Sequence, residues 1–89
     1  MKVSNMTSNS TNREIANQFD IVDNEGNIYF QSYSSIIIKK TPDGKTFLDE
    51  SKWDYSKTTG KYRNMFLGET KKETLDKIKN GTYTLTNLN

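Results

Sequence analysis

Residues 53–67 read W-D-Y-S-K-T-T-G-K-Y-R-N-M-F-L, and we take this stretch as the segment around which the chain is organised. It holds the only tryptophan, two of the five tyrosines, three basic residues and a central glycine. Large rings can anchor one side of such a segment in a core, because each buries a large apolar area. The polar and cationic side chains are then free to face a partner.

The chain around this stretch is short and polar. Its 89 residues make one small domain, and only 31% of them are apolar. The aromatic residues, 11% of the chain, must therefore supply much of the core.

The composition excludes several kinds of chemistry. The sequence has no cysteine, so disulfides and thiolate metal sites are impossible, and it has no histidine, the usual general base and metal ligand. We therefore expect neither an enzyme nor a metal or cofactor site. No apolar run approaches the length of a membrane span, and the N-terminus lacks the apolar segment of a signal peptide. These features predict a cytoplasmic protein.

Charge is distributed unevenly along the chain. The net charge is +2, but residues 1–50 carry five basic and seven acidic side chains, whereas residues 51–89 carry eight basic and four acidic ones. The second half can therefore attract an anionic partner.

The first sixteen residues are rich in Ser, Thr and Asn, and their few apolar residues are scattered. Such a composition rarely offsets the entropy of ordering a chain. We predict a flexible tail over residues 1–16 and a single domain over residues 17–89.

Strand signals dominate from residue 18 to residue 49. We expect a strand over residues 18–23, a turn at the Asn24–Asn27 segment, and a long extended run over residues 28–39. Three serines in the middle of that run predict a bulge, or a break into two strands. The Thr41–Gly44 segment (T-P-D-G) is a turn signal, and a short strand follows over residues 45–49. Consecutive hairpins of this kind predict an antiparallel meander.

Helix signals follow. Thr58 or Thr59 can cap a helix over residues 61–67, which Gly68 ends. Thr70 and Glu73 form a capping box for a second helix that ends near Gly81, before a final strand over residues 82–88. The predicted fold class is α+β: a small antiparallel sheet of three or four strands, with two short helices on one face and a flexible N-terminal tail.

The candidate partner-binding surface combines aromatic, basic and hydrogen-bonding side chains, which are the types that dominate interface hot spots. Its six residues are Tyr55, Lys57, Thr59, Lys61, Arg63 and Asn64. The same surface, together with Lys71, Lys72 and Lys79, could bind nucleic acid, with Tyr55 or Tyr62 stacking on bases. A third possibility is a phosphorylated small molecule bound by the hydroxyls and lysines of residues 56–61, just before a helix N-terminus. No catalytic residues are expected.

The motif W-D-Y-S-x-T-T-x-K-Y-R-N-x-F-L-G-E-T-x-K-E-T, with a closing L-T-N-L-N, resembles a family of small proteins carried by bacteriophages and catalogued as a domain of unknown function. The resemblance covers residues 29–89, and it carries no active site over to this chain.

The resemblance implies a non-enzymatic phage accessory protein that binds a host protein or a ribonucleoprotein complex in the host cytoplasm. Stoichiometric inhibition of a bacterial defence system, of the anti-CRISPR type, is the function that this context favours. The oligomeric state is left open, a homodimer included.

Overall fold

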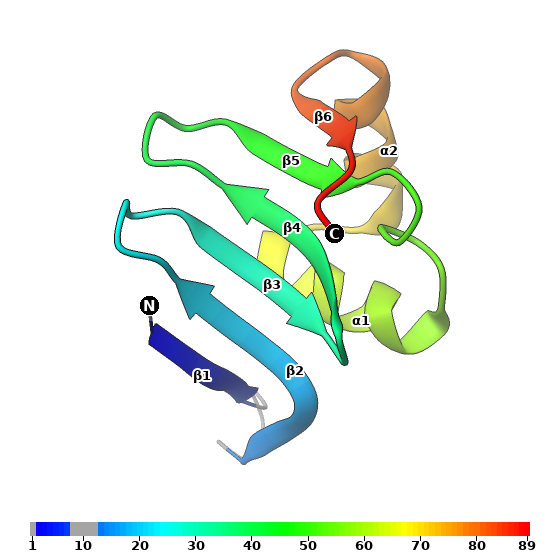
Figure 1. Ribbon diagram of the computed structural model, residues 1–89. Helices are drawn as coiled ribbons and strands as arrows, with labels where there is room; N and C mark the ends of the chain where they lie inside the picture. Colours follow the sequence, from blue (N-terminus) through cyan, green and yellow to red (C-terminus); the bar gives the residue numbers. More distant parts are fainter. Residues whose placement is uncertain (1, 8–12) are drawn as a thin grey trace.

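The computed structural model describes residues 2–7 and 13–89, and the described residues form one sheet and two helices. In chain order the elements are β1 (Lys2–Thr7), β2 (Glu14–Val22), β3 (Ile28–Ser32), β4 (Ser35–Lys40), β5 (Thr46–Asp49), α1 (Lys57–Leu67), α2 (Lys71–Lys79) and β6 (Tyr83–Thr86). The strands lie side by side in the order β1-β2-β3-β4-β5-β6, and both helices lie on the same side of the sheet (Figure 1).

The predicted antiparallel sheet of three or four strands is wrong. The sheet has six strands and is mixed: β1 to β5 are antiparallel neighbours, whereas β6 runs parallel to β5. The parallel pair arises because both helices lie between β5 and β6 in the chain. A crossover of this length returns the chain to the sheet in its original direction, which a tight turn cannot do.

The predicted flexible tail is also wrong where the structure describes it. Residues 2–7 form β1, and residues 14–16 begin β2. β1 pairs with β2 along most of its length, from Lys2 opposite Val22 to Asn5 opposite Phe19. Only Met6 of β1 is buried, so this edge strand is ordered mainly by its ladder with β2. Residues 1 and 8–12 of the predicted tail lie outside the described residues.

The turns in the middle of the chain follow the sequence signals. The serine-rich run does break into two strands, β3 and β4, with Tyr33 at a φ of 56° between them. The T-P-D-G segment turns between β4 and β5, where Gly44 has a φ of 91° that glycine adopts without strain.

The core lies between the sheet and the helices. Phe30, Ile37, Ile38 and Leu48 are completely buried. Phe66 of α1 stacks on Phe30 with ring centroids 5.7 Å apart, which attaches the last turn of α1 to the middle of the sheet.

A buried carboxylate holds the crossover together. The side chain of Glu69, which is 4% exposed, lies between the two helices. It accepts hydrogen bonds from Thr74 at 2.6 Å, Lys77 at 2.6 Å and the Tyr83 hydroxyl at 2.8 Å. Burial alone would raise the pKa of Glu69, but the bonds from Lys77, Thr74 and Tyr83 outweigh it and lower the pKa. The Glu69 carboxylate thus links the segment between α1 and α2 to α2 itself and to β6.

The end of the chain is fixed across the sheet. Asp49, which is 2% exposed, accepts a hydrogen bond from the backbone N–H of Leu88 at 2.8 Å. The side-chain amide of Asn89 bonds both the N–H and the C=O of Ile36, at 2.8 and 3.0 Å. The closing asparagine therefore extends the sheet's hydrogen bonding with a side chain.

We expect Glu69→Gln to lower the free energy of unfolding at pH 7 by about 1–3 kcal/mol, because the buried network loses its negative charge and one of its two acceptor oxygens. The folded-state pKa of Glu69 is depressed, so its contribution is present above the ordinary glutamate pKa and disappears as the pH falls through the folded-state value. The difference between parent and variant should therefore shrink towards pH 3. Urea unfolding followed by tryptophan fluorescence at several pH values measures it.

The matched control is Glu50→Gln, at an exposed position, with an expected change within about 0.5 kcal/mol. A Glu69→Gln penalty that stays constant from pH 7 to pH 3 would contradict the role of the ionised carboxylate.

Candidate functional site at the start of helix α1

Helix α1 begins earlier than the sequence signals indicated. Ser56 is its N-cap, with φ −153° and ψ 160°, and the Ser56 hydroxyl accepts a hydrogen bond from the Thr59 N–H at 3.1 Å. The predicted start at Lys61, with Thr58 or Thr59 as the cap, is wrong. Ser56, three residues before Thr59, offers an equally good cap. Residues 57–61 are therefore helical, and they do not form the loop before a helix on which the phosphate-binding alternative depended.

Arg63 is the structural centre of this region. It is 1% exposed, and its Nη1 donates to the Trp53 carbonyl oxygen at 2.8 Å and to Asp54 at 3.0 Å. Its Nη2 donates to the Asn64 side chain at 3.0 Å, and the guanidinium carbon lies 5.2 Å from the centre of the Trp53 ring. Gly60 lies one turn earlier, and a Cβ there would be 3.6 Å from both terminal nitrogens, so a small residue fits beneath the guanidinium.

Asp54 extends this contact to the second helix. Its carboxylate pairs with Arg63 at 3.0 Å and with Lys71 of α2 at 2.7 Å. Burial raises the pKa of Asp54, but the hydrogen bonds from Lys71 and Arg63 outweigh that effect and lower the pKa overall. The carboxylate therefore stays ionised at neutral pH and holds both cations.

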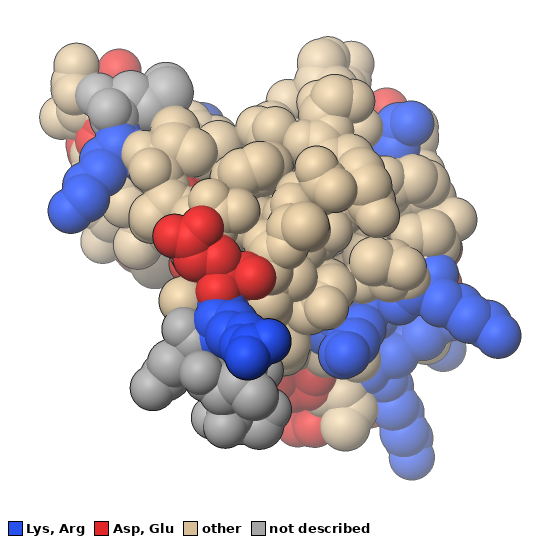
Figure 2. Space-filling view, turned by 90° about the horizontal axis from the view of Figure 1, so that it is seen from below, with Lys and Arg blue, Asp and Glu red and all other residues tan. Residues whose placement is uncertain are grey.

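An open hollow of about 520 Å³ lies over this cluster, and we call it the α1 hollow. It is lined by Asp54, Tyr55, Ser56, Lys57, Gly60, Lys61, Arg63, Asn64 and Lys71. Four of these residues are cations and one is a carboxylate, so the lining is strongly positive. In Figure 2 basic side chains gather towards the lower right, the side on which the helices lie in Figure 1, while uncharged residues fill the broad centre.

The structure brings together five of the six predicted surface residues. Tyr55, Lys57, Lys61, Arg63 and Asn64 all line the hollow. Tyr55 is 45% exposed, both lysines are exposed and Asn64 is half-buried.

Two of the six residues do not face solvent. Thr59 is completely buried and shares a 2.9 Å hydrogen bond with the Ser32 hydroxyl of β3. Arg63 is buried as described, so the expectation that its charge would be presented outward is wrong. Contacts with the Trp53 ring, the Trp53 carbonyl oxygen and the Asp54 carboxylate offset the cost of burying the guanidinium, although its Nε has no partner among the described residues.

Sequence reasoning did not place Asp54 in this site, and it included Lys71 only in the nucleic-acid-binding alternative. Asp54 is the only acidic residue in the stretch from 51 to 68, which also carries four basic ones, and that isolation was the available signal for an internal partner. Lys71 comes from the next helix, and only the fold brings it to the hollow.

Residues 2–7 and 13–89 contain no group of three or more His, Cys, Asp or Glu side chains that could hold a metal ion. Within the same ranges, no helix has the length and apolar character needed to cross a membrane.

The model of a family of unknown function, DUF8033, matches residues 1–81. The chain belongs to this family. The DUF8033 match includes the first 28 residues, which the resemblance by motif left out, and so it contains β1 and β2. No curated protein and no solved structure matches the chain.

We expect Arg63→Met to destabilise the protein by about 3 kcal/mol, because the buried guanidinium makes three charge-assisted or carbonyl bonds and packs on Trp53. Thermal and urea unfolding measure the change. Lys61→Met, which removes an exposed cation from the same helix, should change the free energy of unfolding by no more than about 0.5 kcal/mol. Equal stability of the two variants would show that Arg63 does not hold this region together.

Proposed function

We propose that this protein is a non-enzymatic binding protein that docks an acidic part of a macromolecular partner into the α1 hollow. The observation that carries the proposal is the placement of Lys57 and Lys61 from α1 and Lys71 from α2 around one hollow, with Arg63 beneath them. The single carboxylate of the lining, Asp54, is already paired with two of these cations. An anionic group therefore meets an excess of positive charge there.

The residue types at the rim of the hollow favour a protein as the partner. Tyr55 offers an exposed ring, and Asn64 offers an amide beside it. Tyrosine is enriched at protein interfaces, and polar side chains form their solvent-accessible rim. The hollow is also preorganised, because Arg63 fixes the Trp53–Asp54 segment against α1 and a rigid surface loses less entropy on binding.

The narrower form of this proposal names the partner. It is a host protein or ribonucleoprotein complex of a bacterial defence system, which the protein inhibits by stoichiometric binding in the host cytoplasm. The support for this form is the resemblance of the W-D-Y-S motif to small phage-borne proteins, together with the positive charge of the hollow. The positive charge of the hollow distinguishes this protein from inhibitors that imitate DNA with acidic surfaces.

We expect the double variant Lys57→Glu/Lys61→Glu to bind an acidic partner at least tenfold more weakly, because two attractive charges become repulsive. A poly-glutamate peptide serves as the defined probe, and a protein captured from bacterial lysate serves as the second ligand. The melting temperature should stay unchanged, since both side chains are exposed.

The matched control is Lys2→Glu/Lys79→Glu, which makes the same charge change at two exposed positions outside the hollow. Equal losses in the two double variants would mean that only net charge matters, and the hollow would not be the site.

Direct binding of single-stranded nucleic acid is the second candidate, favoured by the exposed Tyr55 ring among lysines. A salt titration separates the two. Nucleic-acid affinity should fall steeply between 50 and 200 mM salt if several phosphates are contacted, and capture from lysate should then be lost after nuclease treatment.

A further inference from the structure

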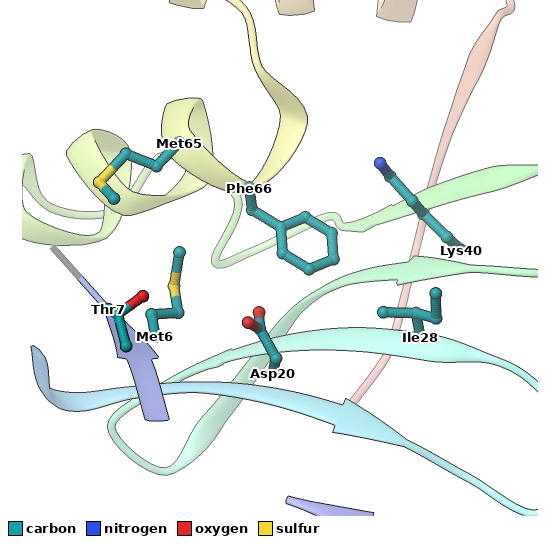
Figure 3. Close-up of a pocket in the computed structure, with 7 residues that line it drawn as sticks. All are labelled: Met6, Thr7, Asp20, Ile28, Lys40, Met65 and Phe66. Atoms are coloured by element: carbon teal, nitrogen blue, oxygen red, sulfur yellow. The ribbon is translucent and has the colours of Figure 1, made fainter. Parts of the chain in front are cut away.

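A second hollow lies on the other half of α1, between that helix and the sheet (Figure 3). Its apolar wall comes from Met6 of β1, Ile28 of β3, and Met65 and Phe66 of α1. We call it the Asp20 pocket after the carboxylate that projects into it from β2. Its volume of about 460 Å³ is in the usual range for small-molecule sites.

Asp20 is placed in surroundings that do not suit a charge. It lies opposite Phe30 in the β2–β3 ladder, on the side of the sheet that α1 covers. Its Oδ1 is shielded from solvent and receives no hydrogen bond from any described residue. Burial raises its pKa. A shielded carboxylate oxygen without a donor is costly, and such a group requires an explanation, such as an ordered water, an ion or a functional role.

The same side of β2 carries a second group of this kind. Gln18, two residues before Asp20, is completely buried, and neither atom of its amide is bonded to a described residue. The strand therefore carries two polar side chains beneath α1, of which Asp20 lines the pocket.

Lys40 of β4 lies at the other side of the pocket. Its Nζ is 5.0 Å from the centre of the Phe66 ring, and no ion pair joins it to Asp20 in the described part of the chain. The negative charge of Asp20 can therefore attract a cationic ligand. Lys40 disfavours a ligand that carries a second positive charge at its other end.

We propose that the Asp20 pocket binds a small primary amine with a single positive charge and a short apolar body. The ammonium donates to the part of the Asp20 carboxylate that projects into the pocket. The apolar body lies against the thioethers of Met6 and Met65 and the ring of Phe66, surfaces that adapt readily to aliphatic groups. Diamines bind less well, because their second ammonium meets Lys40.

The test is a titration of the ¹⁵N-labelled protein with isoamylamine, followed by NMR at pH 7. Isoamyl alcohol, which has the same apolar body without the charge, is the matched ligand, and putrescine is the diamine. Isoamylamine should bind with a dissociation constant at least tenfold lower than that of the alcohol, and it should shift the amide signals of Met6 and Met65. Equal affinity for amine and alcohol, or signals that move elsewhere, would overturn the proposal.

Variants assign the effect to the two charged groups. Asp20→Asn should reduce amine affinity to that of the alcohol, with an unchanged or higher melting temperature, because an amide is easier to bury than an unpaired carboxylate. Lys40→Met should strengthen binding of the diamine. An Asp20→Asn protein that binds isoamylamine like the parent would refute the role of Asp20.

The variant Lys57→Glu/Lys61→Glu belongs to the α1 hollow and should bind isoamylamine like the parent. Its behaviour therefore separates a failure of this proposal from a failure of the proposed partner docking.

Discussion

The buried guanidinium of Arg63 is the contact on which the candidate site depends. It lies over the Trp53 ring and donates hydrogen bonds to the Trp53 carbonyl oxygen and to the Asp54 carboxylate. One side chain thus attaches the segment before α1 to the helix. Asp54 then holds Lys71 and with it the start of α2. A lysine could not replace this arginine, because a single ammonium lacks the planar face and the fork of donors.

Polar links of this kind have a clear use in so small a protein. Among residues 2–7 and 13–89 only four apolar side chains are completely buried, at the centre of the sheet, which leaves the ends of the described part with little apolar area to bury. Glu69 and Asp49 join elements at those ends. Glu69 connects the segment between the helices to β6, and Asp49 connects β5 to Leu88. Ionised groups that are fully bonded stabilise positions that the core does not reach.

The sequence allowed some of these features to be predicted and hid others. Signals that act within a few residues were reliable: the capping box of Thr70 and Glu73 is formed, and Gly68 ends α1 in a left-handed conformation. The start of α1 was missed because three neighbouring hydroxyl residues are competent caps, and local propensity cannot choose among them. β1 and the parallel position of β6 depend on pairing with distant strands, which composition and periodicity do not reveal.

The candidate site shows the same division. The gathering of Tyr55, Lys57 and Lys61 on one surface follows from their closeness in the chain. The burial of Arg63 and the arrival of Lys71 do not, because both depend on how α1 and α2 pack. The position of the Asp20 carboxylate, whose Oδ1 has no partner among the described residues, was equally hidden. Alternation along residues 18–23 indicates two faces of a strand without saying which face a helix will cover.

The two ends of helix α1 line different hollows. Its first turns present lysines to the α1 hollow, and its last turn lines the Asp20 pocket with Met65 and Phe66. Each end is separately attached, the first by Arg63 to the Trp53–Asp54 segment and the last by Phe66 to Phe30 of β3. A helix held at both ends has one position relative to the sheet. Coupling between sites requires an element with two arrangements that each ligand favours differently. The two attachments of α1 argue that the hollows act independently, the α1 hollow in the proposed docking of a macromolecule and the Asp20 pocket in the proposed binding of a small amine.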